Sequence, residues 1–294
     1  MKVGFIGLGH MGRPMAENVL KKYPLVIYNR TKDKAKPLLD KGAIWADSPQ
    51  KVADESDFVI LMVTDDKVCT EVITGTTGIT NTKNLKVTVV NTSTISPSKS
   101  REFFKLLTAR HLRYVEAPVS GSTVPAKDGT LKILVAGEKK DFDYVQPVLS
   151  TMGDKIFYIG NIGKAAELKL LLNVNLAVMT AIFSETLTLG QSCGIPPATM
   201  LDIMNSTNIG NVISKGKGPN MIKGEYPTTS PYPHIIKDLT YALQLAESKK
   251  FSMPVASLVK DLYIKGLKQG LAEKDFSAIL EVYLKGMAKS TTPP

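Results

Sequence analysis

The feature that most constrains this chain is a glycine-rich turn between a short apolar run and a helical pattern. Residues 3–7 have the composition of a buried strand, and residues 11–21 carry apolar side chains at helical spacing. Between them the sequence reads Gly7-Leu8-Gly9-His10-Met11-Gly12. Glycines at this spacing permit a tight turn, close approach of the main chain to a pyrophosphate, and close packing of helix on strand. The context predicts a dinucleotide-binding turn; the alternative is a turn whose glycines serve packing only.

The first half of the chain alternates strands and helices. The sequence predicts helices at residues 32–41 and 97–110, and further strands at residues 25–28, 58–63, 87–91, 114–117, 131–136 and 155–158. The third and fourth strands are almost continuously apolar, as expected for strands covered on both faces. We therefore expect an α/β domain over residues 1–162, with a Rossmann-type, doubly wound and mostly parallel sheet.

Helical periodicity replaces this alternation from residue 163 onward. Residues 168–194 are apolar nearly all round, which predicts a long helix buried on most sides, and Gly160 and Gly163 bracket its start as a hinge. We expect residues 163–294 to form an all-α domain for substrate binding and oligomerisation, joined to the first through this long interdomain helix. Polar residues within the helix argue against a membrane span.

Composition excludes several classes of protein. With 294 residues, 43% of them hydrophobic, the chain can form two globular domains. Two cysteines and no signal-peptide-like run near the N-terminus indicate a reducing, cytoplasmic location. The net charge of +10 is scattered without a basic run, which favours a solvated surface or attraction of acidic metabolites over nucleic acid. The three histidines and two cysteines form no ligand pattern, so we expect no metal.

The residues after the second expected strand bear on which dinucleotide is bound. NAD binding favours a carboxylate here, whereas the chain has Asn29-Arg30-Thr31. The guanidinium of Arg30 and the hydroxyl of Thr31 can bind a 2′-phosphate. This predicts a preference for NADP(H) over NAD(H); the alternative is an exposed loop arginine.

Lys169 lies within the apolar helix, with Asn173 four residues later on the same face. A lysine in such a place is costly unless it reaches solvent, pairs or takes part in chemistry. Burial lowers the pKa of an ammonium group, which suits proton donation to a carbonyl oxygen during hydride transfer. The alternative is a lysine that extends past the helix to water.

Four motifs occur in an order that resembles the β-hydroxyacid dehydrogenase family. They are the glycine turn, Glu116-Ala-Pro-Val-Ser-Gly-Ser122, the stretch 160–173, and Lys237-Asp238-Leu239. The family includes 3-hydroxyisobutyrate dehydrogenases and glyoxylate/succinic semialdehyde reductases. The chain is most similar to the reductase branch at Asn29-Arg30-Thr31, Ser122, residues 215–219 and Asp275-Phe-Ser277. Ser230 departs from that branch, which often has an aromatic residue near this position.

The resemblance implies a role for each matching residue. Lys169 would be the general acid/base. The substrate would be bound by Ser120, Gly121, Ser122, Asn173 and Asp238. The cofactor would be contacted by Gly7, Leu8, Gly9, His10, Met11, Gly12, Asn29, Arg30, Thr31, Met62, Val63, Thr64, Thr94 and Lys237.

We therefore expect an NADPH-dependent reductase of short aldehyde acids, such as succinic semialdehyde or glyoxylate, with Lys169 as the acid. One alternative is an NAD-dependent dehydrogenase of the 3-hydroxyisobutyrate type. Another is a cofactor-binding interaction module with weak catalysis. In the first of these interpretations, the partner of the protein would be a small carboxylate-bearing substrate. We also expect a homo-oligomer, a dimer or tetramer, because the helices offer more apolar surface than two cores require.

Overall fold

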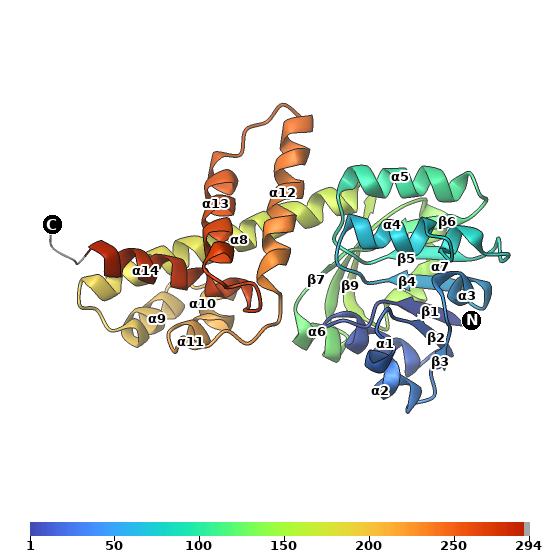
Figure 1. Ribbon diagram of the computed structural model, residues 1–294, viewed down its shortest axis with the longest axis horizontal. Coiled ribbons are helices and arrows are strands. Elements are labelled where there is room, and N and C mark those ends of the chain that lie inside the picture. Colours follow the sequence, from blue (N-terminus) through green and yellow to red (C-terminus); the bar gives the residue numbers. More distant parts are fainter. Residues whose placement is uncertain (291–294) are drawn as a thin grey trace. The chain divides into compact units, whose positions relative to one another are not determined.

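The computed structural model describes residues 1–290 (Figure 1). The chain divides into two compact units, Met1–Lys169 and Leu170–Pro294. The long helix α8 (Lys164–Ser192) begins in the first unit and continues into the second. The division thus falls within this helix, six residues beyond its start at Lys164.

The first unit holds all the strands of the described chain. They are β1 (Val3–Ile6), β2 (Leu25–Tyr28), β3 (Ile44–Trp45), β4 (Phe58–Leu61), β5 (Thr88–Asn91), β6 (Arg113–Glu116), β7 (Val119–Ser120), β8 (Leu131–Ala136) and β9 (Gly153–Gly160). Its helices before α8 are α1 (Gly12–Leu20), η1 (Lys32–Ala35), α2 (Lys36–Leu39), α3 (Pro49–Asp54), α4 (Asp66–Thr74), η2 (Ile79–Asn81), α5 (Pro97–Thr108), α6 (Thr123–Asp128) and α7 (Lys139–Leu149).

The strands form one sheet in the order β3-β2-β1-β4-β5-β6-β8-β7, with β9 paired to β8. The six strands from β3 to β6 are parallel, whereas β8 runs antiparallel to β6 and β7 and parallel to β9. The expected doubly wound α/β fold is therefore confirmed. The strands β3 and β7, two residues each, are additions that the sequence pattern did not predict, because two residues cannot display an alternation.

Two hydrophobic clusters cover the two faces of this sheet. Phe58 and Ile60 of β4 belong to one cluster, and Val59 and Leu61 belong to the other, because successive strand side chains point to opposite faces. Residues of α1, α2, α6 and α7 complete the first cluster, and residues of α3, α4 and α5 complete the second. In Figure 1, α4 and α5 lie on one side of the sheet, and α1, α2 and α6 lie on the other. Burial on both faces explains the continuous apolar runs.

The second unit consists of helices. After α8 come α9 (Pro197–Ser206), α10 (Val212–Gly216), α11 (Gly218–Met221), α12 (Tyr232–Ser248), α13 (Pro254–Lys268), η3 (Phe276–Ile279) and α14 (Leu280–Ser290). Their core includes Leu170 and Phe183 of α8, Tyr232 of α12 and Tyr263 of α13. The expected change from an α/β to an all-α region is confirmed.

The helix α8 is less buried than its composition suggested. Leu171, Leu172, Ile182 and Leu189 are each at least 40% exposed, so the expectation of burial on most sides was wrong for this part of the surface. By length and composition α8 is also the one described helix that could cross a membrane, although 44% of its most apolar window is buried. Because its other face contributes to the core of the second unit, we interpret α8 as a core helix. The predicted homo-oligomer would depend on its exposed apolar residues.

Candidate functional site

The parallel strands bring the predicted cofactor residues to one edge of the sheet. Five strand-terminal residues pair in register across it: Tyr28, Ile6, Leu61, Asn91 and Glu116. The segments that follow these residues contain the glycine turn, Asn29-Arg30-Thr31, residues 62–64, Thr94 and Ser120. The carboxyl edge of an open parallel sheet is where such folds bind ligands, at the point where the strand order reverses between β1 and β4.

The three glycines of the turn have different surroundings. Gly7 has φ +100°, and a Cβ there would lie 2.2 Å from the carbonyl oxygen of Met62. A Cβ at Gly12 would lie 1.9 Å from the carbonyl oxygen of Gly7. At Gly9, by contrast, a Cβ would meet no atom of residues 1–290 within 4 Å. Two glycines are therefore required by the protein itself, and the third leaves main chain open to approach, which fits a bound pyrophosphate.

The side chains of this turn also differ in their access to a ligand. Leu8 is 2% exposed and belongs to the core, and Met11 packs against the same cluster. Leu8 can therefore contact a cofactor only through its main chain, whereas Met11 is partly buried. His10 is exposed.

The side chain of Asn29 forms hydrogen bonds that hold the glycine turn in place. Its Oδ1 accepts a hydrogen bond from the amide of Leu8 at 2.8 Å, and its Nδ2 donates to the carbonyl of Thr31 at 2.8 Å. The next two residues, Arg30 and Thr31, are exposed. Lys32 lies over the ring of Trp45, at 5.2 Å from its centroid. An exposed cation and hydroxyl at the end of β2 are groups that could bind a phosphate.

The ends of β4 and β5 are joined by hydrogen bonds. The amide of Val63 donates to the Oγ of Ser93 at 3.0 Å, and the amide of Ser93 donates to the Oδ1 of Asn91 at 3.0 Å. Met62 and Val63 are half-buried, Thr64 is exposed and Thr94 is half-buried. These bonds fix the loop of residues 62–64 relative to the loop that contains Thr94.

The loop from Ser120 to Ser122 joins β7 to α6. Gly121 has φ +134°, and a Cβ there would lie 2.8 Å from Leu131, so this position requires glycine. Asn18 of α1 donates to the carbonyl of Ala126 in α6 at 2.8 Å. The helix that follows the glycine turn therefore supports the helix that follows this loop. Ser120 and Ser122 are half-buried, so their hydroxyls remain within reach of a ligand.

Lys169 lies in the second turn of α8 and is 9% exposed. The start of this helix is held by Glu116, whose Oε1 accepts from the amide of Gly163 at 2.6 Å. The Oε2 of Glu116 accepts from the amide of Ala166 at 3.3 Å. In the first turn of the helix, Glu167 forms ion pairs with Arg101 and Lys164. A buried lysine on an anchored helix is a candidate proton donor.

A second group of predicted site residues meets in the helical unit. The Nδ2 of Asn173 in α8 donates to the Oδ2 of Asp238 in α12 at 2.6 Å. The Nζ of Lys237 lies 3.0 Å from the Oδ1 of Asp238 and 5.3 Å from the ring centroid of Tyr241. Asp238 is 6% exposed. Asp238 therefore orients the side chains of both Asn173 and Lys237, which makes it a supporting residue for these two groups.

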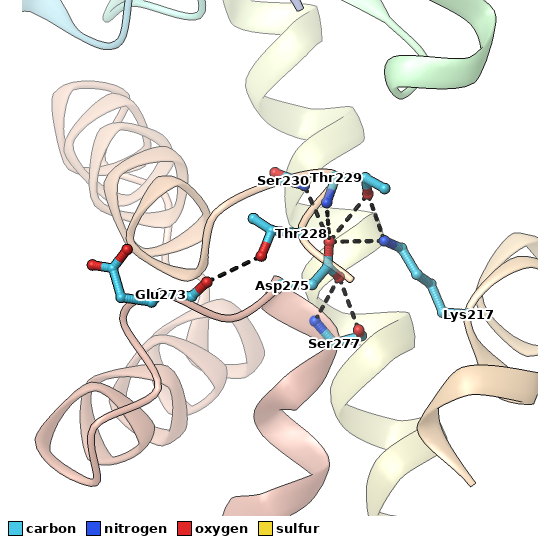
Figure 2. A network of polar contacts seen from close by, with 7 residues as sticks. All are labelled: Lys217, Thr228, Thr229, Ser230, Glu273, Asp275 and Ser277. Carbon is cyan, nitrogen blue, oxygen red and sulfur yellow. Dashed lines mark hydrogen bonds and ion pairs between the residues drawn. The ribbon is translucent and has the colours of Figure 1, made fainter. Parts of the chain in front are cut away.

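The segment that leads into α12 is held by Asp275 (Figure 2). The carboxylate is fully buried and accepts six hydrogen bonds. Its Oδ2 accepts from the Nζ of Lys217 at 2.8 Å, from the amide and hydroxyl of Thr229 and from the amide of Ser230, and its Oδ1 accepts from the amide and hydroxyl of Ser277. The main chain at Ser230 is thus fixed two residues before α12 begins.

The pKa of Asp275 reflects this environment. Burial acts to raise the pKa of the carboxyl, but the hydrogen bond and charge of Lys217, together with main-chain amides, outweigh it and hold the pKa below its ordinary value. Asp275 therefore stays ionised at neutral pH and keeps the hydrogen bonds of the segment in place.

Three residues with supporting roles were missed by reasoning from sequence: Ser93, Asp275 in its carboxylate role, and Glu116 as an anchor of α8. Glu116 gave one usable signal, since it is the one charged residue in the expected strand 114–117. Ser93 resembles an ordinary loop residue, and Asp275 was noted only as part of the Asp275-Phe-Ser277 motif. The supporting roles of both residues follow from hydrogen-bond partners that are distant in the sequence. Within residues 1–290, no group of three or more histidine, cysteine, aspartate or glutamate side chains could hold a metal ion.

Comparison with known proteins covers nearly the whole chain. Residues 2–160 match the family described as the NAD binding domain of 6-phosphogluconate dehydrogenase. Residues 163–283 match the family described as NAD-binding of NADP-dependent 3-hydroxyisobutyrate dehydrogenase.

Individual relatives agree with these matches. Glyoxylate/succinic semialdehyde reductase 1 of Arabidopsis thaliana is 36% identical over 96% of this chain and 98% of its own length. The chloroplastic reductase 2 of the same plant is 36% identical over 96% of this chain and 79% of its own length. Among solved structures, 3-hydroxyisobutyrate dehydrogenase from Salmonella typhimurium is similar with a TM-score of 0.88 and 25% identity, over 96% of this chain and 99% of that one.

Proposed function

Because this chain belongs to the β-hydroxyacid dehydrogenase family, we propose that it reduces short aldehyde acids such as succinic semialdehyde and glyoxylate, with NADPH as the cofactor. The observation that carries the proposal is Lys169, a 9% exposed lysine on α8 whose helix is anchored at its first turn. The names of the two plant reductases support the choice of substrate.

The residues of the carboxyl edge fit a phosphorylated dinucleotide. The turn provides open main chain at Gly9, and Arg30 and Thr31 provide a cation and a hydroxyl for a 2′-phosphate. When bound, the nicotinamide supplies the hydride that reduces the carbonyl carbon.

The chain itself supplies proton transfer and orientation. Lys169 donates a proton to the carbonyl oxygen, so that the developing alkoxide is neutralised as it forms. Ser120 and Ser122, with the main chain of Gly121, bind the substrate carboxylate through N–H and O–H donors. Asn173, oriented by Asp238, adds a further donor one helical turn beyond Lys169. Fixed donors at both ends of the substrate reduce the cost of orienting it.

A substrate panel tests the proposal as a whole. We expect the highest kcat/KM for NADPH oxidation with succinic semialdehyde or glyoxylate, and a lower value with NADH. The measurement is the initial rate of cofactor oxidation with each aldehyde acid, and of NAD+ or NADP+ reduction with 3-hydroxyisobutyrate. A higher kcat/KM for NAD+ with 3-hydroxyisobutyrate would instead identify a dehydrogenase working oxidatively. Cofactor binding without turnover on any substrate would identify a binding module.

Replacement of Arg30 tests the choice of cofactor. If Arg30 binds the 2′-phosphate, the Arg30→Ala variant loses a charge-assisted hydrogen bond, and its KM for NADPH should rise about 10- to 100-fold. The KM for NADH should change less than about twofold, because NADH lacks that phosphate. Lys22→Ala removes an equal charge from an exposed position just after α1 and serves as the matched control. Equal changes for the two cofactors would contradict the role of Arg30.

A further inference from the structure

The carboxylate of Glu116 holds the beginning of the helix that carries Lys169. Glu116 is the last residue of β6 and is 2% exposed, and it lies 47 residues before Gly163 in the sequence. Its two oxygens accept from the amides of Gly163 and Ala166 at 2.6 and 3.3 Å. Gly163 immediately precedes α8 and Ala166 lies in its first turn, where N–H groups have no acceptor within the helix. A carboxylate is also favoured there by the helix dipole.

Glu116 receives more hydrogen bonds than a simple helix cap. Burial raises the pKa of its carboxyl, and hydrogen bonds from Ser100 and from main-chain amides at the start of α8 act in the opposite direction. Ser100 in turn lies 2.9 Å from the hydroxyl of Tyr114. That hydroxyl accepts from the Nδ2 of Asn91 at 3.3 Å. A buried polar chain therefore runs from the end of β5 to the start of α8.

This polar chain also reaches the cofactor edge of the sheet. Asn91 accepts from the amide of Ser93, and Ser93 accepts from the amide of Val63. The loops after β4 and β5 and the first turn of α8 are thus connected through side chains buried in the same unit. Lys169 lies three residues after Ala166, so any displacement of the first turn of α8 is transmitted to it.

Glu116 also begins the segment that ends in the predicted carboxylate-binding loop. Ser120 follows it by four residues, and Ser122 by six. One short segment therefore contacts the helix of the proton donor at its start and presents the substrate donors at its end. The separation between these two groups depends on how Glu116 is bound to α8.

We propose that Glu116 is a positioning residue, which fixes Lys169 relative to the loop of Ser120, Gly121 and Ser122 by binding two main-chain amides at the start of α8. The inference rests on the proposed function, because it assigns Lys169 the part of proton donor. Misplacing a catalytic group by about 1 Å can cost about 100-fold in rate. Glu116 therefore influences catalysis without touching the substrate.

The test is Glu116→Gln, which keeps the shape of the side chain but replaces one acceptor oxygen with an NH2 group. We expect kcat with succinic semialdehyde or glyoxylate to fall about 10- to 100-fold, while the KM for NADPH changes less than about threefold. Amide hydrogen exchange in peptides covering residues 160–170 should become faster. Asp141→Asn is the matched control, since Asp141 is also a buried carboxylate of the first unit and should leave both readouts unchanged.

Several results would overturn the proposal. These are an unchanged kcat in folded Glu116→Gln, unchanged exchange in residues 160–170, or an equal loss of kcat in Asp141→Asn. If Glu116→Gln does not fold, the Tyr114→Phe variant replaces it, because it removes the hydroxyl beside Ser100. This variant should show a smaller decrease in kcat and faster exchange in the same peptides. No change in either readout would also overturn the proposal. If the wild-type protein reduces no aldehyde acid, the proposed function fails, and hydrogen exchange alone then decides whether Glu116 holds α8.

Discussion

Replacing Lys169 with alanine should lower kcat for aldehyde-acid reduction by about 100- to 10,000-fold, the range for loss of a general acid. The Kd for NADPH should stay within a few-fold of wild type, because the residues predicted to bind the cofactor precede α8 except for Lys237. Single-turnover kinetics and NADPH fluorescence titration measure the two effects separately. Lys169→Arg should be almost as inactive, because a guanidinium keeps the charge but gives up its proton too reluctantly to act as an acid.

The matched control for this prediction is Lys164→Ala. Lys164 is on the same helix, but it is exposed and pairs with Glu167. Its replacement should leave kcat within about twofold of wild type, since exposed ion pairs contribute little. Substantial turnover by Lys169→Ala, or an equal loss in Lys164→Ala, would show that Lys169 is not the acid.

Replacing Asp275 with alanine should destabilise the helical unit by about 3–5 kcal/mol, because it leaves the half-buried Lys217 and the main-chain N–H groups of Thr229, Ser230 and Ser277 without their acceptor. The free energy of unfolding in urea, followed by far-UV circular dichroism, measures the loss. Lys217→Met should cost less, because five of the six hydrogen bonds to Asp275 come from other groups. Glu273→Ala is the control: its exposed carboxylate points away from the network (Figure 2), and its replacement should change little.

The carboxylate of Asp275 should also make the stability of the protein depend on pH. The pKa of Asp275 is lower in the folded than in the unfolded protein, so its stabilising contribution is complete above the unfolded pKa of about 4 and is lost as pH falls through the folded pKa. Wild-type stability should therefore decrease more steeply below about pH 4 than that of Asp275→Asn. Parallel pH profiles for the two proteins would show that Asp275 does not titrate in this way.

The sequence predicted the sheet well because its strands are marked by local pattern. Residues 25–28 and 131–136 were predicted with the bounds of β2 and β8, since apolar runs flanked by turn residues define both ends. The family was also identified from ordered motifs, and full-length relatives confirm it. The predicted helix at 32–41 instead begins as the short helix η1, and α2 follows with Pro37 in its first turn. Proline has no amide hydrogen to donate, and so it is accommodated at the start of a helix. The spacing of apolar residues does not show that one helix ends and another begins here.

By itself, the sequence determined that a glycine turn joins a buried strand to a helix and that a lysine lies within an apolar helix. Both are properties of residues close together in the chain, where spacing alone fixes geometry. The tertiary structure decided which acids support those features: Glu116 binds amides 47 and 50 residues away, Asp238 orients Asn173 across 65 residues, and Asp275 binds Lys217 across 58. No local pattern encodes such partners, because they meet only when separate helices and strands pack and the buried polar groups must find each other.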